Sequence, residues 1–201
     1  MVPTSATTLE TPADWTRLDP EDKRQRLLGV ATELFILDGL DVAMPAVANA
    51  AGVGIGSLYR VFPSKEELIA AMVVREMQRL RSEVSRAHED EDAGAALERT
   101  IRHLVDRQAT NKLLRAALAV TSDRREVRVA VGEVSLAWQE LLDRARRQGS
   151  VRTDATVTDV RLVFAASAAA DEIEPDGRRR MVDLLLEAMR GRTPEVPMAR
   201  G

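Results

Sequence analysis

Apolar residues recur at helical spacing along most of the chain, and breaks between them divide it into about nine segments. A spacing of three and four residues places such side chains on one face of a helix. Little of the chain shows the alternation typical of strands, so the sequence predicts an all-α fold. The expected helices cover residues 19–38, 44–51, 55–62, 65–86, 94–110, 112–121 and 124–147, followed by one that includes the Ala-rich run ending at 170 and one that begins at 175 or 176.

The stretch 47–68, VANAAGVGIGSLYRVFPSKEEL, carries the most informative pattern. Gly52 is expected to end one short helix, because glycine tolerates the left-handed backbone found there. The following short helix has an apolar face and a polar face; these are Leu58, Val61 and Phe62 against Ser57, Tyr59 and Arg60. Pro63 ends that helix, and Ser64 with Glu67 predicts a capping box for the next one. Two short helices around a tight turn are the outline of a DNA-reading helix-turn-helix.

The same region resembles the tetracycline-repressor (TetR) family of bacterial transcription regulators. The resemblance runs from about Lys23 to Met72 and includes RQRLLGVATELF, AGV at 51–53, SLYRVF at 57–62 and SKEEL at 64–68. The variant AGVGIG is similar to an actinobacterial subgroup. The alternative is an ordinary helical hairpin in an all-α domain with no role in DNA binding.

The resemblance implies an N-terminal helix-turn-helix domain of three helices and a C-terminal helical domain for ligand binding and dimerisation. We expect a disordered arm over 1–18, the DNA-binding domain over 19–66, the ligand-binding and dimerisation domain over 67–192, and a loose tail over 193–201. In this reading Tyr59 and Lys65 hold phosphates, and Ile55 touches a thymine methyl group. The expected DNA-binding residues are Arg24, Pro45, Gly54, Ile55, Gly56, Ser57, Tyr59, Arg60 and Lys65.

The charge of the chain argues against a strongly basic DNA-binding surface. The formal net charge is −3, and the segment 19–67 has five basic and eight acidic residues. Ala43 also stands where the family usually has a Ser or Thr that caps the second helix and contacts the DNA backbone. DNA binding would therefore rest on a few well-placed contacts and would depend modestly on salt. A helical interaction module that has lost DNA binding stays open as an alternative.

The last helix is too apolar to be covered by its own domain, and the Ala-rich run of the helix before it lets another backbone approach closely. Together they predict a four-helix contact with a second copy of the chain. A homodimer would also let two reading heads bind a palindromic operator of double-stranded DNA. The expected interface residues are Val163, Ala166, Ala170, Val182, Leu185, Leu186 and Met189.

A small-molecule effector is expected between the middle helices of the C-terminal domain, as the family resemblance implies. The candidate residues are His103, Leu104, Arg107, Leu118, Thr121, Trp138 and Phe164. They indicate a largely apolar effector. Four of them have an ordinary alternative: His103 as a surface histidine, Arg107 as part of an ion pair, and Trp138 and Phe164 as core residues.

Other functional classes find little support. The chain has no cysteine, no 18-residue apolar run and no signal-peptide pattern, so we expect a cytoplasmic protein without a membrane span. Asp90 and Asp92 lack the ligand spacing of a calcium loop, and no set of metal ligands is expected. An all-α enzyme is the least favoured alternative, because no catalytic set accompanies His103 and the GVGIG segment has no strand before it. We expect no cofactor.

Overall fold

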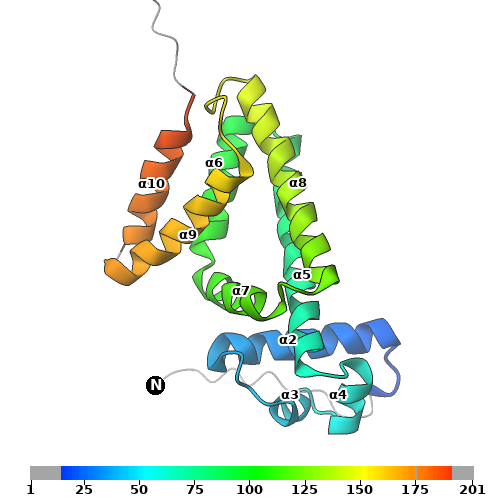
Figure 1. Cartoon of the computed structure of the whole chain (residues 1–201). Helices are drawn as coiled ribbons and strands as arrows, with labels where there is room; N and C mark the ends of the chain where they lie inside the picture. Colours follow the sequence, from blue (N-terminus) through cyan, green and yellow to red (C-terminus); the bar gives the residue numbers. More distant parts are fainter. Residues whose placement is uncertain (1–14, 175, 192–201) are drawn as a thin grey trace, which may run out of the picture. The chain divides into compact units, whose positions relative to one another are not determined.

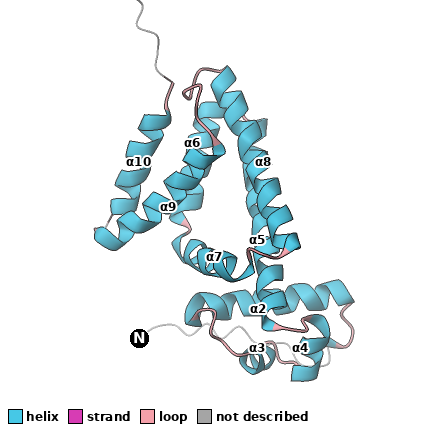
Figure 2. Cartoon of the chain, in the orientation of Figure 1, coloured by secondary structure: helices cyan, strands magenta, loops and turns pink. Residues whose placement is uncertain are grey.

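The computed structural model describes residues 15–174 and 176–191, except for the side chains of 108–111 and 171–172. Within this part the chain is all-α, as predicted, with nine α-helices and one short 3₁₀ helix (Figure 2). The only β-bridge among these residues joins Val151 and Arg190. The expected tail 193–201 and most of the expected arm 1–18 lie outside the described residues. No helix in the described part is both long and apolar enough to cross a bilayer.

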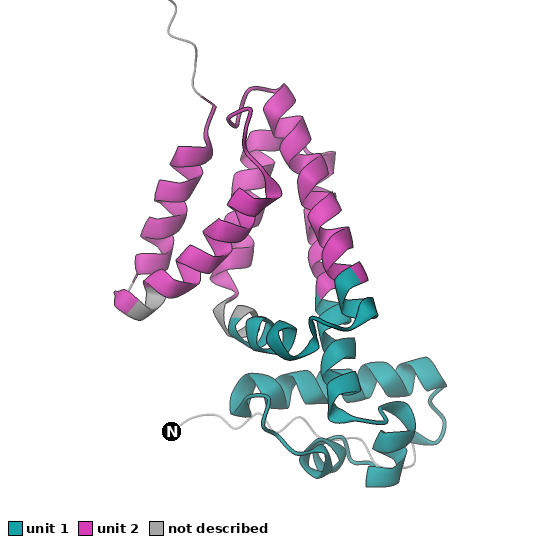
Figure 3. Ribbon diagram, in the orientation of Figure 1, with its two compact units in different colours: residues 1–76, 112–128 teal, residues 77–111, 129–201 magenta. Residues whose placement is uncertain are grey.

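The chain divides into two compact units, shown in different colours in Figure 3. Unit 1 comprises residues 1–76 and 112–128, and unit 2 comprises residues 77–111 and 129–201.

Unit 1 is built on α2 (Pro20–Asp38), α3 (Met44–Ala50) and α4 (Ile55–Val61), which pack against one another (Figure 1). It also contains the first half of α5 (Lys65–Arg86) and most of α7 (Gln108–Thr121). Each of these helices contributes apolar side chains to the interior. The most deeply buried include Leu27, Leu28, Phe35, Val47, Leu58, Phe62 and Leu68.

Local signals explain where α2 begins and ends. Asp19 caps it, because its carboxylate accepts the N–H of Asp22 at 2.8 Å. Gly39, with φ +79°, follows the last helical residue, and its N–H donates to Phe35 O at 3.0 Å. Arg75 of α5 then ties the two helices together, since its guanidinium donates to the hydroxyl of Thr32 at 2.7 Å.

Unit 2 contains the rest of α5 together with α6 (Ala93–Asp106), most of α8 (Arg125–Arg147), α9 (Val157–Ile173) and α10 (Gly177–Met189). The last two helices pack closely side by side (Figure 1). Their tight connection depends on a glycine at 177, because a Cβ atom there would lie 2.3 Å from Ala170 O. The core of the unit includes Ile101, Leu104, Trp138, Leu141, Leu142, Val163 and Leu186.

The boundary between α6 and α7 differs from the sequence prediction. The predicted helix 94–110 ends at Asp106, and α7 begins at Gln108, four residues before the predicted start at 112. The break falls at Arg107, whose backbone leaves the helical region with ψ +58°. Neither Gly nor Pro stands near this position, so the sequence carries no local signal for the break.

Candidate nucleic-acid interface

The turn between α3 and α4 is closed by two backbone hydrogen bonds around Gly52. The N–H of Gly52 donates to Asn49 O at 3.0 Å, and the N–H of Val53 donates to Ala48 O at 2.9 Å. This pair of bonds forms a Schellman motif, which needs a residue in the left-handed region, and Gly52 has φ +68°. The predicted role of Gly52 as a helix terminator is confirmed.

Helix α4 has one side that is buried in unit 1 and another side that is exposed. Leu58 is fully buried and Phe62, which follows the helix, is 1% exposed, so both anchor the segment in unit 1. On the other side, Tyr59 is 45% exposed and Ile55 is 42% exposed, and Arg60 is also exposed. The helix therefore presents a surface with a phenol, a guanidinium and one apolar side chain.

The nine DNA-binding candidates all lie on unit 1, and none has a buried side chain. Six of them are exposed, namely Pro45, Gly54, Ile55, Gly56, Tyr59 and Arg60, and three are partly buried, namely Arg24, Ser57 and Lys65. The guanidinium of Arg24 lies over the ring of Phe62, 4.6 Å from its centroid. This cation–π contact connects α2 to the end of α4 and limits how far Arg24 can reach.

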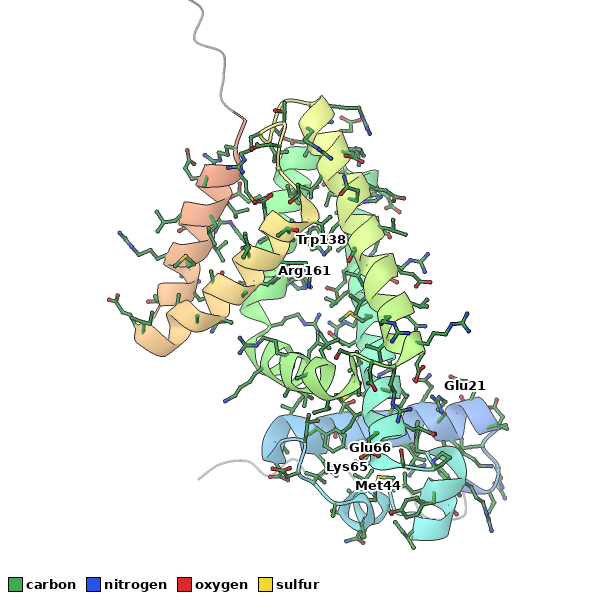
Figure 4. All side chains as sticks on the ribbon, viewed as in Figure 1. Glu21, Met44, Lys65, Glu66, Trp138 and Arg161 are labelled. Carbon is green, nitrogen blue, oxygen red and sulfur yellow. The ribbon has the colours of Figure 1, made fainter. Side chains whose placement is uncertain are left out.

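The start of α5 shows one half of the predicted capping box. The hydroxyl of Ser64 accepts the N–H of Glu67 at 3.2 Å. The neighbouring Glu66 has a lowered pKa, chiefly because its carboxylate accepts its own backbone N–H and also bonds Ser64. Figure 4 shows Lys65 and Glu66 at this end of the helix. At the start of α3, Ala43 makes no capping hydrogen bond with its side chain.

The ligand-binding candidates are divided between the two units. Leu118 and Thr121 belong to unit 1, and the other five belong to unit 2. Thr121 is fully buried, and its hydroxyl already donates to Ala117 O at 2.8 Å. Leu118 is partly buried.

Within unit 2, His103 and Arg107 converge on one carboxylate, that of Glu83 on α5. The guanidinium of Arg107 lies 3.4 Å from Oε1 of Glu83, and Nε2 of His103 lies 4.0 Å from Oε2. The side chain of His103 is 66% exposed, whereas that of Glu83 is only 10% exposed. Glu83 could not be singled out from the sequence, because an acidic residue on a long charged helix fits the pattern of a solvated face.

The remaining ligand candidates of unit 2 lie in its apolar core. Leu104 and Trp138 are buried, and Phe164 is partly buried against the same core. The rings of Trp138 and Phe164 are in contact, with centroids 6.2 Å apart and planes tilted by 59°. Figure 4 labels Trp138 on α8 together with Arg161 on the neighbouring part of α9.

Most of the predicted dimer residues lie on the inward face of α9 and α10, so the predicted face is wrong. Five of the seven, Val163, Ala170, Val182, Leu186 and Met189, are buried inside unit 2, so they are not available to a second chain. Ala166 and Leu185 are partly exposed. The exposed apolar residues of α9 follow helical spacing on another face; they are Leu162, Ala165, Ala169 and Ile173. On α10 the exposed pair is Leu184 and Ala188.

The fold and the α3–α4 arrangement define a two-unit, all-helical protein with a helix-turn-helix, and comparison with known proteins identifies the family. Residues 27–72 match the model for bacterial regulatory proteins of the tetR family. Residues 92–191 match the model for the C-terminal domain of SbtR-like transcriptional regulators. This chain therefore belongs to the TetR family of bacterial regulatory proteins.

Individual relatives agree with this assignment. A TetR transcriptional regulator from Streptomyces coelicolor is 30% identical, with a TM-score of 0.61 over 85% of this chain and 99% of that chain. A TetR transcription regulatory protein from Mycobacterium vanbaalenii is 28% identical, with a TM-score of 0.65 over 87% and 99%. The transcriptional repressor KstR of Rhodococcus jostii is 40% identical over 63 residues, covering 31% of this chain and 30% of that protein. This chain thus matches only about a third of the curated relative.

Proposed function

We propose that this protein is a ligand-responsive transcriptional repressor, which binds a palindromic DNA operator as a homodimer and is released by a small molecule. The observation that carries the proposal is the two-faced helix α4. Leu58 holds it in the core, while Tyr59 and Arg60 remain exposed on a short helix next to a glycine-closed turn. This is the arrangement that a recognition helix needs to enter the major groove.

The exposed side chains of α4 have suitable chemistry for DNA. Arg60 can donate to guanine or to phosphate, and Tyr59 can donate its hydroxyl to phosphate. Ile55 offers an apolar contact to a thymine methyl group. Gly54 and Gly56 have no side chain and no neighbouring atom within 4 Å of an added Cβ, so the backbone can approach the duplex closely.

The proposed homodimer pairs α9 and α10 of one chain with the same helices of a second chain. Its surface combines the exposed leucines 162 and 184 with small residues that allow close helix packing. Two-fold pairing would provide two recognition helices. One short helix with few polar groups could not specify an operator alone.

The effector is proposed to bind within unit 2, and the protein is proposed to act in the cytoplasm without a cofactor. The Trp138–Phe164 contact supports a partly aromatic, largely apolar ligand site. A free-energy coupling of about 1–3 kcal/mol between effector and operator would be enough for regulation.

A mobility-shift titration of the purified protein with its own upstream DNA tests the proposal. We expect a specific complex at low salt that survives an excess of unrelated DNA. A protein that forms no complex under these conditions would instead fit a second candidate function, a helical interaction module without DNA binding. The acidic balance of residues 19–67 and the uncapped start of α3 favour this second candidate.

A further inference from the structure

Two buried polar atoms in the described part of the chain have no hydrogen-bond partner. They are Oε2 of Glu83 and Oγ of Ser167, and both belong to unit 2. A buried acceptor without a donor costs about 1–3 kcal/mol, and a charged one costs more, so few such atoms persist without a reason. Glu83 is the more informative of the two, because an ionised carboxylate can only accept.

The two oxygens of Glu83 have different surroundings. Oε1 accepts from Nε of Arg79 at 2.9 Å and lies 3.4 Å from the guanidinium of Arg107. Nε2 of His103 lies 4.0 Å from Oε2, which is too long for a hydrogen bond. The carboxylate is therefore held through one oxygen while the other remains an oriented, unused acceptor.

The charges around Glu83 restrict what can approach Oε2. Arg79, Arg107 and His103 already lie beside this carboxylate, so an additional cation at Oε2 would be placed next to several basic side chains. An anionic group would face the charged oxygen itself and would be repelled. A neutral hydroxyl or N–H group satisfies the acceptor without either cost.

We infer that Oε2 of Glu83 accepts a hydrogen bond from an uncharged hydroxyl or N–H group of the effector. This inference rests on the proposed function, because it assumes that a small molecule binds in unit 2. Arg79 and Arg107 are then positioning residues, which hold the carboxylate through its other oxygen. The effector is an apolar molecule with a neutral donor, and neither a carboxylic acid nor an amine.

Four small aromatic probes distinguish these chemistries: phenol, anisole, benzoate and benzylamine. The chain has two histidines and two tryptophans, so NMR signals of the His103 ring and the Trp138 indole can be assigned with His88→Gln and Trp15→Phe variants. We expect phenol to shift the His103 signal saturably and to bind at least tenfold more tightly than the other three probes.

The variant Glu83→Gln should weaken phenol binding at least tenfold. The matched control is Glu133→Gln, which removes an exposed carboxylate that pairs with another α5 arginine, Arg81. The control should bind phenol like the wild type. The ranking of the four probes on the wild-type protein needs no variant, so it tests the inference even if Glu83→Gln fails to fold.

The inference fails if benzoate or benzylamine binds as tightly as phenol, if folded Glu83→Gln binds phenol normally, or if no probe shifts the His103 signal. A separate mobility shift without any probe distinguishes this failure from failure of the proposed function. Normal DNA binding with such a probe result overturns only the Glu83 assignment. Selective phenol binding by a protein that binds no DNA overturns only the regulator proposal.

Discussion

Leu58 and Tyr59 are neighbours in sequence, yet one is fully buried and the other is 45% exposed. Successive residues of an α-helix point about 100° apart, so a helix of seven residues can separate anchoring from binding. In α4 the apolar side of the helix stabilises unit 1, and the polar side is available to DNA. Substitutions on the two sides should therefore have different consequences.

Arg60→Ala should weaken operator binding by about 1–3 kcal/mol, since it removes a contact to a base or a phosphate. Tyr59→Phe should weaken it as well, because only the hydroxyl is lost. Neither change should lower the free energy of unfolding by more than about 0.5 kcal/mol, because both residues are exposed. Fluorescence anisotropy with labelled operator and urea unfolding measure the two quantities.

The control for these variants is Leu58→Ala, which should lower the free energy of unfolding by about 2–5 kcal/mol through loss of a buried side chain. If Arg60→Ala and Tyr59→Phe both bind the operator like the wild type, the polar face of α4 does not contact DNA. A large loss of stability in Arg60→Ala would show that the residue has a structural role instead.

Residue patterns predicted the faces of α4 well but could not find Glu83. The buried and exposed positions of α4 follow directly from helical spacing, and Gly52 stands where a positive φ is required. Glu83 is one of many charged residues on α5, and its burial depends on Arg107 and His103 of another helix. Local sequence carries no information about such a long-range contact.

At the level of elements, two glycines near α4 have different roles. Gly52 has φ +68°, where an L-residue is strained, whereas Gly56 lies within the helix and its added Cβ would meet no atom within 4 Å. Gly52→Ala should therefore lower the free energy of unfolding by about 1–2 kcal/mol. Gly56→Ala should leave it unchanged or raise it by up to about 1 kcal/mol.

The same pair of variants tests how closely α4 approaches DNA. Gly56→Ala should weaken operator binding despite its unchanged or higher stability, because the new methyl group keeps the backbone away from the duplex. Thermal unfolding and anisotropy titrations of both variants provide the measurement. Full operator affinity in Gly56→Ala would contradict a close backbone approach at this position.

The start of α9 has a pH-dependent cap. Burial opposes ionisation of Asp159, but the N–H and hydroxyl of Thr156, at 2.7 and 2.9 Å, together with the charge of Arg152, lower its pKa. Because the pKa of Asp159 is lower in the folded state, its ionised carboxylate stabilises the fold at pH values above the usual pKa of Asp, near 4. This stabilisation is lost as the pH falls through the folded-state pKa.

Asp159→Asn should therefore lower the free energy of unfolding by about 1 kcal/mol at pH 7, and the difference from the wild type should shrink below about pH 4. Urea unfolding from pH 3 to pH 7 measures this dependence. Asp154→Asn, at a carboxylate that is 74% exposed, is the control and should show a much smaller effect. A difference that is constant with pH would rule out the charged cap.

The boundaries of most helices were predictable, but the phase of α9 was not. Recognisable local chemistry marks several helix ends, at Asp19, Gly39 and Gly52, and at Gly149, which follows α8 with φ +72°. The apolar residues of α9 occur on more than one face, so spacing alone could not decide which face packs inward. The structure buries Val163 and exposes Leu162, which moves the proposed pairing surface to the other face.

At the scale of the whole molecule, the proposed function requires two chains. Leu184→Glu should convert the dimer to a monomer, because it places a charge on the proposed α9–α10 surface. Light scattering after size-exclusion chromatography measures the mass. Leu136→Glu is the control, since Leu136 is also exposed but lies on α8, and it should leave the mass unchanged. A dimeric Leu184→Glu would place the interface elsewhere.

Loss of the dimer should also weaken DNA binding, even though α4 itself is unchanged. Each chain contributes only a few cationic contacts, because residues 19–67 carry more acidic than basic side chains. The affinity of one reading head is therefore expected to be low, and the dimer combines two of them. Family membership was evident from the helix-turn-helix motif, whereas the pairing surface required the structure.

A hydroxyl-radical footprint of the purified protein on its upstream DNA tests the central claim most directly. Two helix-turn-helix heads on a two-fold dimer should protect two patches on one face of the duplex, with centres about 10 bp apart or at a multiple of that spacing. Arg60→Ala at the same concentration should lose both patches together. A single protected patch, no protection at low salt, or an unchanged footprint with Arg60→Ala would contradict the account.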